Sequence, residues 1–239
     1  MALTPALYLI PVNISDEPLS NVLPAGNINI VREIRHFIVE NVRTARRFLK
    51  KCDRQIDIDT LTFHELNAHT DLTEVSSWLD PLRSGEPVGV MSEAGCPAVA
   101  DPGSLAVAIA HRDGLRVIPL VGPSSIIMAL MGSGFNGQSF VFHGYLPVDD
   151  AARARALREL ESRSQRDGST PIFIETPYRN NRMMQTLTSA LKGDTMVCVA
   201  CDVTDSGRES IITMSVADWR RAVYDYTKRP AIFLIHRAK

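Results

Sequence analysis

Short apolar runs alternate with longer segments of helical periodicity along the first half of the chain. The runs have the length of strands and cover residues 6–11, 36–40, 87–91 and 115–120. Strand-length runs separated by helix-length segments are typical of βαβ units, in which neighbouring strands are parallel. The first half of the chain is therefore predicted to form an α/β domain with a parallel sheet.

The second half contains further strand-length runs but fewer segments that could form crossover helices. These runs cover residues 139–144, 170–176, 195–201, 210–215 and 230–236. One continuous parallel sheet would need more crossover helices than this half supplies. The run at 210–215 also follows the preceding run closely, which favours an antiparallel pair. The pattern predicts two α/β domains, residues 1–121 and 122–239.

Three segments carry clear helix signals. Residues 151–163 are rich in alanine, leucine, arginine and glutamate, and the acidic VDD sequence before them suits a helix N-terminus. Residues 179–193 end in a glycine that suits a helix C-terminus. In residues 120–134, Pro123 suits the first helical position, and serines are available to cap the helix.

Composition and charge narrow the class of protein. Of the 239 residues, 45% are hydrophobic and 22% are charged, as in folded globular proteins. The formal net charge of -1 provides no overall field for phosphates, so a nucleic acid would have to be held by a local basic patch. The N-terminal MALTPALYLIP has neither a basic leader nor a long apolar run, which predicts a protein that is neither secreted nor membrane-spanning.

The four cysteines are scattered, which argues against a disulfide scaffold and favours a reducing cytoplasm. Cys198 and Cys201 form a CxxC sequence, but both lie in the apolar run at 195–201. Side chains three residues apart in a strand point to opposite faces, so one metal ion could hardly be bound by both. These cysteines are predicted to be buried in the core.

Two short sequences match known motifs by letter but fail on context. GSGFNG at 132–137 fits the dinucleotide-binding pattern, but it follows a helical segment and precedes a strand, the reverse of the required order. In FHELNAH, His64 and His69 are five residues apart. Five residues advance a helix by about 500°, so the two imidazoles would not share a face. Neither a dinucleotide site nor a zinc site is predicted.

The segment MSEAGCPAVADPGSLAVAIA, residues 91–110, is the most unusual part of the chain. A buried strand is predicted to end at Met91 and an apolar helix to begin near Ser104. The loop between them exceeds the usual length of about 2–6 residues. Open α/β sheets bind ligands at the carboxyl ends of their strands, and a helix N-terminus can receive a carboxylate. From spacing alone, a ligand-binding loop and an ordinary connection are equal alternatives.

Residues 40–51, ENVRTARRFLKK, combine a helical pattern with many basic side chains. The basic residues are Arg43, Arg46, Arg47, Lys50 and Lys51. At helical spacing Arg43, Arg47 and Lys50 form one stripe opposite the apolar side chains Val42, Ala45 and Leu49. Such a stripe suits phosphates, although a solvated helix face is the commoner outcome for a run of charges.

Several stretches spread over nearly the whole chain form a recognisable series. They are LYLIP at 7–11, ENVRTARRFL at 40–49, FHELN at 63–67, SEAGCPAVADPG at 92–103, VIPLVGPSSIIMAL at 117–130, FVFHGYLP at 140–147 and IFIETPYR at 172–179. The series resembles the tetrapyrrole methylase superfamily of S-adenosylmethionine-dependent methyltransferases. It is most similar to the branch that methylates small-subunit ribosomal RNA.

The resemblance implies a homodimer of two-domain α/β chains with S-adenosyl-L-methionine in the cleft between the domains, which favours the ligand-binding interpretation of the long loop. The implied cofactor-binding residues are Glu93, Ala94, Gly95, Cys96, Val99, Ser124, Ser125, Thr176, Pro177, Val203, Pro230 and Ala231. The implied acceptor is a ribose 2′-hydroxyl of a cytidine in ribosomal RNA, bound by Arg43, Arg46 and Arg47 facing the cofactor. No metal is required, because a sulfonium already makes its methyl group electrophilic.

Three segments depart from the superfamily's pattern. The acidic-threonine-arginine segment before the basic helix reads ENVRT here, at residues 40–44. In ACDVTD, Cys201, Asp202 and Asp205 stand where the superfamily has arginine, glutamate and lysine, and the first loop, PVNISDEPLS, lacks the usual glycine. These departures keep two alternatives open, a methyltransferase for another acceptor such as a tetrapyrrole and a non-catalytic S-adenosylmethionine-binding protein. The general base is not identified, and Glu40 and Glu93, together with Asp101, are candidates by type and place.

Overall fold

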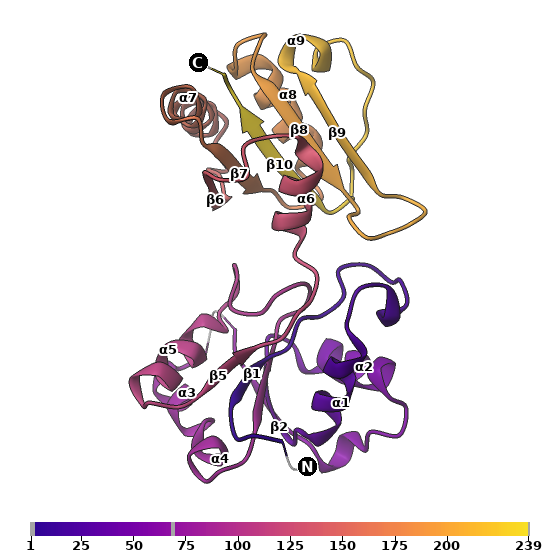
Figure 1. Ribbon diagram of the computed structural model, residues 1–239. Coiled ribbons are helices and arrows are strands. Elements are labelled where there is room, and N and C mark those ends of the chain that lie inside the picture. Colours follow the sequence, from indigo (N-terminus) through magenta and orange to yellow (C-terminus); the bar gives the residue numbers. More distant parts are fainter. Residues whose placement is uncertain (1–2, 68–69, 239) are drawn as a thin grey trace. The chain divides into compact units, whose positions relative to one another are not determined.

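The computed structural model describes residues 3–67 and 70–238 of the chain. It divides into two compact units, Met1–Ser124 and Ser125–Lys239 (Figure 1). Each unit contains its own five-stranded sheet with helices packed against it. The prediction of a two-sheet α/β protein is therefore confirmed.

The sheet of the first unit is entirely parallel, as the sequence predicts. Its strands are β1 (Leu7–Leu9), β2 (His36–Val39), β3 (Thr62–Glu65), β4 (Val88–Met91) and β5 (Val117–Pro119). They are ordered β3-β2-β4-β1-β5, and every neighbouring pair is parallel. The sequence analysis missed β3, an edge strand with no fully buried side chain.

Helices cover both faces of this sheet (Figure 1). They are α1 (Ala25–Glu33), α2 (Val42–Cys52), α3 (Leu72–Ser77), α4 (Asp80–Arg83) and α5 (Ser104–Arg112), with short 3-10 turns at Leu19–Asn21 and Ile58–Thr60. Alternate strand residues enter different cores: Tyr8 and Phe37 pack with α1 and α2, whereas Leu7 and Ile38 pack with α3, α4 and α5. Burial on both faces explains why these strands are almost continuously apolar.

The sheet of the second unit is mixed. Its strands are β6 (Phe140–Tyr145), β7 (Thr170–Ile174), β8 (Met196–Cys201), β9 (Ser210–Ser215) and β10 (Ala231–His236). In the order β6-β7-β10-β8-β9, the neighbouring pair β6 and β7 is parallel and the other three neighbouring pairs are antiparallel. The predicted antiparallel pairing of β8 with β9 is confirmed. Cys198 and Cys201 on β8 are fully buried, also as predicted, and burial raises the pKa of the Cys201 thiol to about 12.

The helices of the second unit are α6 (Ser125–Ser133), α7 (Asp150–Asp167), α8 (Asn180–Ala190) and α9 (Val216–Trp219). Helices α7, α8 and α9 share one core with β7, β8 and β10, and α6 packs against β8, β9 and β10. The predicted acidic cap of α7 is Asp149, whose carboxylate accepts the Ala152 N–H at 2.8 Å. Two predicted helix ends were wrong: Pro123 lies before α6, and α8 ends with Leu191 as its cap rather than at Gly193.

The structure places GSGFNG and FHELNAH outside the contexts that a dinucleotide site and a helical zinc site need. Helix α6 ends at Ser133, and Gly134 follows with a φ of 76°, so GSGFNG turns the chain towards β6. His64 lies in β3 and stacks on Trp78, with ring centroids 5.0 Å apart. His69 lies outside the described residues. Within residues 3–67 and 70–238, no cluster of three or more His, Cys, Asp or Glu side chains could hold a metal ion.

Candidate functional site

The long loop at residues 92–103 follows β4, which lies between β2 and β1 in the sheet. Because all strands of this sheet are parallel, the segments that follow β1, β2 and β4 all leave from the side of the sheet where the strands have their carboxyl ends. We call this side the carboxyl edge of the sheet. This is the edge at which open α/β sheets bind their ligands. The loop ends where α5 begins, at Ser104, as predicted.

Backbone and side-chain bonds tie this loop to its neighbours. Val12 and Gly95 exchange two backbone hydrogen bonds, of 2.9 and 3.0 Å, which fix the loop to the segment after β1. The Cys96 thiol donates to the Pro123 carbonyl at 3.4 Å, which fixes it to the segment after β5. The loop is therefore held at several points along its length.

Asp101 organises the second half of the loop. Its Oδ1 accepts the backbone N–H of Ala98 at 3.0 Å and that of Gly103 at 2.6 Å. Ala98 and Ala100 have φ values of 66° and 62°, in the left-handed region that costs a residue with a side chain about 1–3 kcal/mol. The bonds to Asp101 help to hold this strained backbone in place.

The second carboxylate oxygen of Asp101, Oδ2, is buried and has no hydrogen-bond partner in the described part of the chain. Burial raises the pKa of this carboxyl above its ordinary value, and the N–H groups of Gly103, Ala98 and Val99 oppose the rise. A buried acid with one orphaned oxygen is a costly feature in a loop. Perturbed acids of this kind concentrate at functional sites.

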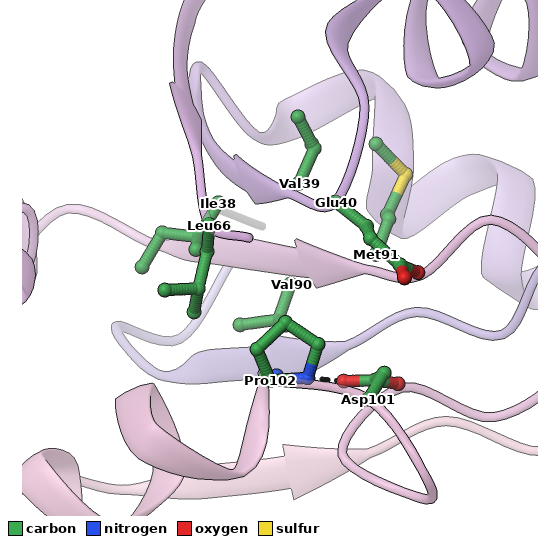
Figure 2. A pocket seen from close by; sticks show the side chains of 9 residues that line it. Ile38, Val39, Glu40, Leu66, Val90, Met91, Asp101 and Pro102 are labelled. Carbon is green, nitrogen blue, oxygen red and sulfur yellow. Dashed lines mark hydrogen bonds between the residues drawn. The ribbon is translucent and has the colours of Figure 1, made fainter. Parts of the chain in front are cut away.

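Glu40 lies beside this loop, directly after β2. Its N–H donates to the Met91 carbonyl at 3.2 Å, and its Oε2 accepts the Glu93 N–H at 3.1 Å. Figure 2 shows Glu40 and Asp101 near the end of β4, around a pocket. This pocket has a cavity volume of about 10 Å³, far below the roughly 300–1,000 Å³ typical of small-molecule sites, so it is a gap beneath the loop and not a complete ligand site.

The basic helix α2 begins at the same edge, immediately after Glu40 and Asn41. Asn41 caps it, because its side-chain oxygen accepts the N–H groups of Arg43 at 2.9 Å and Thr44 at 3.2 Å. Glu65 at the end of β3 accepts the Val42 N–H at 3.4 Å. Bonds of this type satisfy N–H groups that have no partner within a helix.

The outer face of α2 carries a concentrated positive charge. Ala45, Phe48 and Leu49 are buried, whereas Arg43, Arg46, Arg47, Lys50 and Lys51 are exposed. At about 100° per residue these five cations occupy an arc of roughly 140°. None of them forms an ion pair with a described residue: both lysines donate to backbone carbonyls, and the Arg46 guanidinium lies over the Phe63 ring at 5.4 Å. We call these five residues the α2 basic face.

The sequence-predicted residues of the second unit gather at one edge of its sheet. They are Thr176 and Pro177 after β7, Val203 after β8, and Pro230 and Ala231 at the start of β10. Because β10 is antiparallel to β7 and β8, its first residues lie beside the last residues of those strands. The Lys228 N–H also donates to the Pro177 carbonyl at 2.9 Å. Ser125 is the first residue of α6, and Ser124 precedes it.

Backbone strain marks both groups of predicted residues. The described non-glycine residues with left-handed φ values are Ala98, Ala100, Asp202, Thr204 and Lys228. The first two lie in the long loop, and the other three lie at the edge of the second sheet. Strain of this kind clusters at ligand and active sites. Sequence reasoning did not predict the left-handed backbone at these residues, because nothing in an alanine, threonine or lysine signals it.

Asp202, the acidic side chain of ACDVTD that stands where the superfamily has a glutamate, is paired with arginines within the second unit. The Asp202 carboxylate is almost fully buried, and its Oδ2 lies 2.6 Å from Arg229 Nε and 3.5 Å from Arg208 Nη2. The Arg229 guanidinium also lies over the Tyr226 ring at 5.8 Å. Arginines from other segments therefore surround the acidic side chain.

The fold is shared with solved methyltransferases of low sequence similarity. The methyltransferase CobJ aligns with a TM-score of 0.59 and 16% identity, covering 91% of this chain and 89% of that one. The cobalamin biosynthetic enzyme CbiF, a cobalt precorrin-4 methyltransferase, aligns with a TM-score of 0.60 and 16% identity, covering 97% and 95%. The chain thus has the two-domain α/β fold of the tetrapyrrole methylases.

Sequence relatives define the family within this class. Three of these relatives are proteins named ribosomal RNA small subunit methyltransferase I, from Vibrio cholerae, Micromonospora olivasterospora and Mesorhizobium japonicum. Their sequence identities to this chain are 30%, 33% and 31%, over alignments that cover 97%, 85% and 87% of it, in the same order. The matches span 77%, 61% and 66% of those proteins, in the same order. No protein-family model matches the chain. The chain belongs to the ribosomal RNA small subunit methyltransferase I family, and the expectation of a methyltransferase is confirmed.

Proposed function

We propose that this protein transfers the methyl group of S-adenosyl-L-methionine to a ribose 2′-hydroxyl of small-subunit ribosomal RNA. Two features at the same side of the first sheet carry the proposal. One is the loop at residues 92–103, whose strained backbone is fixed by hydrogen bonds, and the other is the α2 basic face, whose cations form no ion pair with described residues. The first feature suits a small ligand that needs fixed geometry. The second suits a polyanion.

The loop residues Glu93, Ala94, Gly95, Cys96 and Val99 would hold the cofactor. The N–H groups of this loop and the start of α5 suit the carboxylate of an amino acid. Bound S-adenosylmethionine supplies an electrophilic methyl group, so the chain's own residues have to bind, orient and exclude water. The contacts expected from Ser124 and Ser125, and from the edge of the second sheet, stay predictions.

The α2 basic face would hold the phosphates of the RNA. Its cations are exposed and have no carboxylate partner among the described residues, so their charge is available to a ligand. Release of counterions from neutralised phosphates supplies most of such binding. The sequence relatives bear the name of ribosomal RNA methyltransferases, which favours RNA over a tetrapyrrole as the acceptor.

The test is methyl transfer from labelled S-adenosylmethionine to small ribosomal subunits that lack the modification, with the free RNA assayed in parallel. A 2′-O-methyl group removes the hydroxyl that attacks the adjacent phosphodiester in alkali. The proposal predicts label in an alkali-resistant dinucleotide. Label on a base, or transfer to no RNA by a protein that binds the cofactor, would contradict it.

Two further expectations accompany the proposal. A homodimer is expected from the family resemblance, and a cytoplasmic location from the free cysteines. In the described part of the chain, no helix has both the length and the apolar character needed to cross a membrane.

A further inference from the structure

Three carboxylates near the end of β4 are candidates to receive the proton of the attacking hydroxyl, and the geometry separates them. Asp101 Oδ1 already accepts two N–H groups, and its Oδ2 is shielded from solvent. The Glu93 side chain is exposed, and no bond to a described residue positions it. Of the three, only Glu40 has one carboxylate oxygen fixed by a hydrogen bond and the other without a partner among the described residues.

We propose that Glu40 is the catalytic base of the reaction, acting through Oε1. This inference rests on the proposed function and deepens it. Glu40 Oε2 is fixed by the Glu93 N–H at 3.1 Å, and the Glu40 backbone is fixed by the Met91 carbonyl at 3.2 Å. Glu40 Oε1 has no hydrogen-bond partner among the described residues. One oxygen therefore anchors the carboxylate to the cofactor loop while the other is available.

The position of Glu40 links the two proposed binding regions. One bond joins its side chain to the loop, and two residues along the chain α2 begins, with Arg43 as the first cation of the α2 basic face. Figure 2 shows Glu40 at the end of β4, close to Met91. A nucleotide whose phosphate is bound by α2 would place its ribose within reach of this carboxylate.

The proposed step balances without another reactant. The 2′-hydroxyl gives its proton to Glu40 Oε1 while its oxygen forms a bond to the methyl carbon. The bond between that carbon and sulfur breaks, and its electron pair stays on sulfur, which becomes a neutral thioether. Glu40 then releases the proton to water. General-base assistance of this kind typically contributes about 10²–10⁴ in rate.

Glu40→Gln is the sharpest test, because the Gln amide oxygen can still accept the Glu93 N–H. We expect single-turnover transfer at saturating cofactor and RNA to fall at least about 100-fold. Calorimetric affinity for S-adenosylmethionine and affinity for RNA should stay within about twofold of wild type, a change of under roughly 0.5 kcal/mol. Glu40→Asp, which keeps a carboxylate, should retain an intermediate rate and serves if the Gln variant does not fold.

Glu86→Gln is the matched control. Glu86 lies before the amino end of β4, and its Oε2 lies 3.1 Å from His36 Nε2, so it is a hydrogen-bonded acid at the other end of the same strand without a proposed role in binding or chemistry. Its variant should transfer methyl groups at close to the wild-type rate.

Two results would overturn the role of Glu40. One is a Glu40→Gln protein that transfers at close to the wild-type rate. The other is a loss of rate matched by an equal loss of cofactor affinity, which would make Glu40 only a support for the loop. A wild-type protein that binds cofactor but methylates no RNA would instead overturn the proposed function, and the role of Glu40 with it.

Discussion

The long loop after β4 and the helix after β2 leave neighbouring strands at the same sheet edge, yet they are built in opposite ways. The loop contains two strained alanines and is held by backbone, thiol and carboxylate bonds. Helix α2 has ordinary geometry with a capped start, and its outer face carries five cations that make no ion pair with described residues. The loop therefore has a fixed backbone geometry, whereas the outer face of α2 has a high density of exposed positive charge.

This difference teaches how one edge can serve two kinds of ligand. A small cofactor has few atoms to bind, so its site depends on a fixed arrangement of donors. A polyanion is bound through many exposed charges and tolerates imprecise contacts. Variants of the loop should therefore change cofactor affinity without changing RNA affinity, and variants of α2 should do the reverse.

Asp101→Ala should have the largest effect. It removes the acceptor for two N–H groups that hold strained backbone, a loss of about 2–3 kcal/mol, or roughly 30- to 150-fold in S-adenosylmethionine affinity. Calorimetry measures the change. Asp101→Asn, whose amide oxygen can accept the same N–H groups, should bind within about threefold of wild type. Equal losses in both variants would show that the bonds to Ala98 and Gly103 are not what matters.

Replacing Arg43, Arg46 and Arg47 together by Gln should weaken RNA binding and leave cofactor affinity unchanged. Three lost phosphate contacts on a single strand reduce the slope of log affinity against log salt concentration by about 2. Binding assays over a range of salt concentrations measure this slope. Three arginines on another exposed surface, Arg155, Arg158 and Arg166 of α7, provide the control triple variant. An unchanged slope would remove α2 from the RNA site.

Gly95→Ala should have a smaller effect that distinguishes loop geometry from general stability. Gly95 has a φ of 76°, where a side chain costs about 1 kcal/mol, or roughly fivefold in affinity if the loop shifts. Gly85 has a φ of 93° in the turn after α4, so an alanine there would be under comparable strain away from the loop. Both Ala variants should lower the melting temperature, but only Gly95→Ala should weaken cofactor binding. Equal binding by the two variants would count against a fixed loop.

The smallest effect is expected for the stability of Asp101→Asn as a function of pH. Because burial raises the pKa of Asp101 in the folded protein, this group favours folding at low pH and less so as pH rises through the raised value. Asparagine has no such dependence. The Asn variant should therefore gain melting temperature relative to wild type between acid and neutral pH. A difference in melting temperature between the variant and wild type that stays constant with pH would contradict the raised pKa of Asp101.

The sequence predicts most strands, because strands buried on one or both faces leave clear apolar runs. It misses β3 because this edge strand alternates partly exposed polar and apolar residues, with Thr62 and Glu65 the most exposed. The ends of α6 and α8 were misjudged because proline and glycine signals are local. The observed ends depend on how each helix packs and on which backbone groups are free to cap it.

The same limit applies to the site. Loop length and composition made residues 92–103 a candidate on equal terms with an ordinary connection, and the family resemblance favoured the ligand-binding loop. Helical spacing predicted the exposed side of α2. The left-handed conformation of Ala98, the bond between Glu40 and the Glu93 backbone, and the pairing of Asp202 with Arg229 could not be predicted. Each depends on contacts between residues that are set by the folded chain and have no sequence signature.

Calorimetric titration of the wild-type protein with S-adenosylmethionine, compared with S-adenosylhomocysteine, tests whether the strained loop belongs to a cofactor site. We expect saturable binding of both compounds, because both present the same amino acid and nucleoside groups to the protein. A folded protein that releases no heat with either compound, and is not stabilised by them against thermal unfolding, would contradict the assignment of this protein as an S-adenosylmethionine-dependent enzyme.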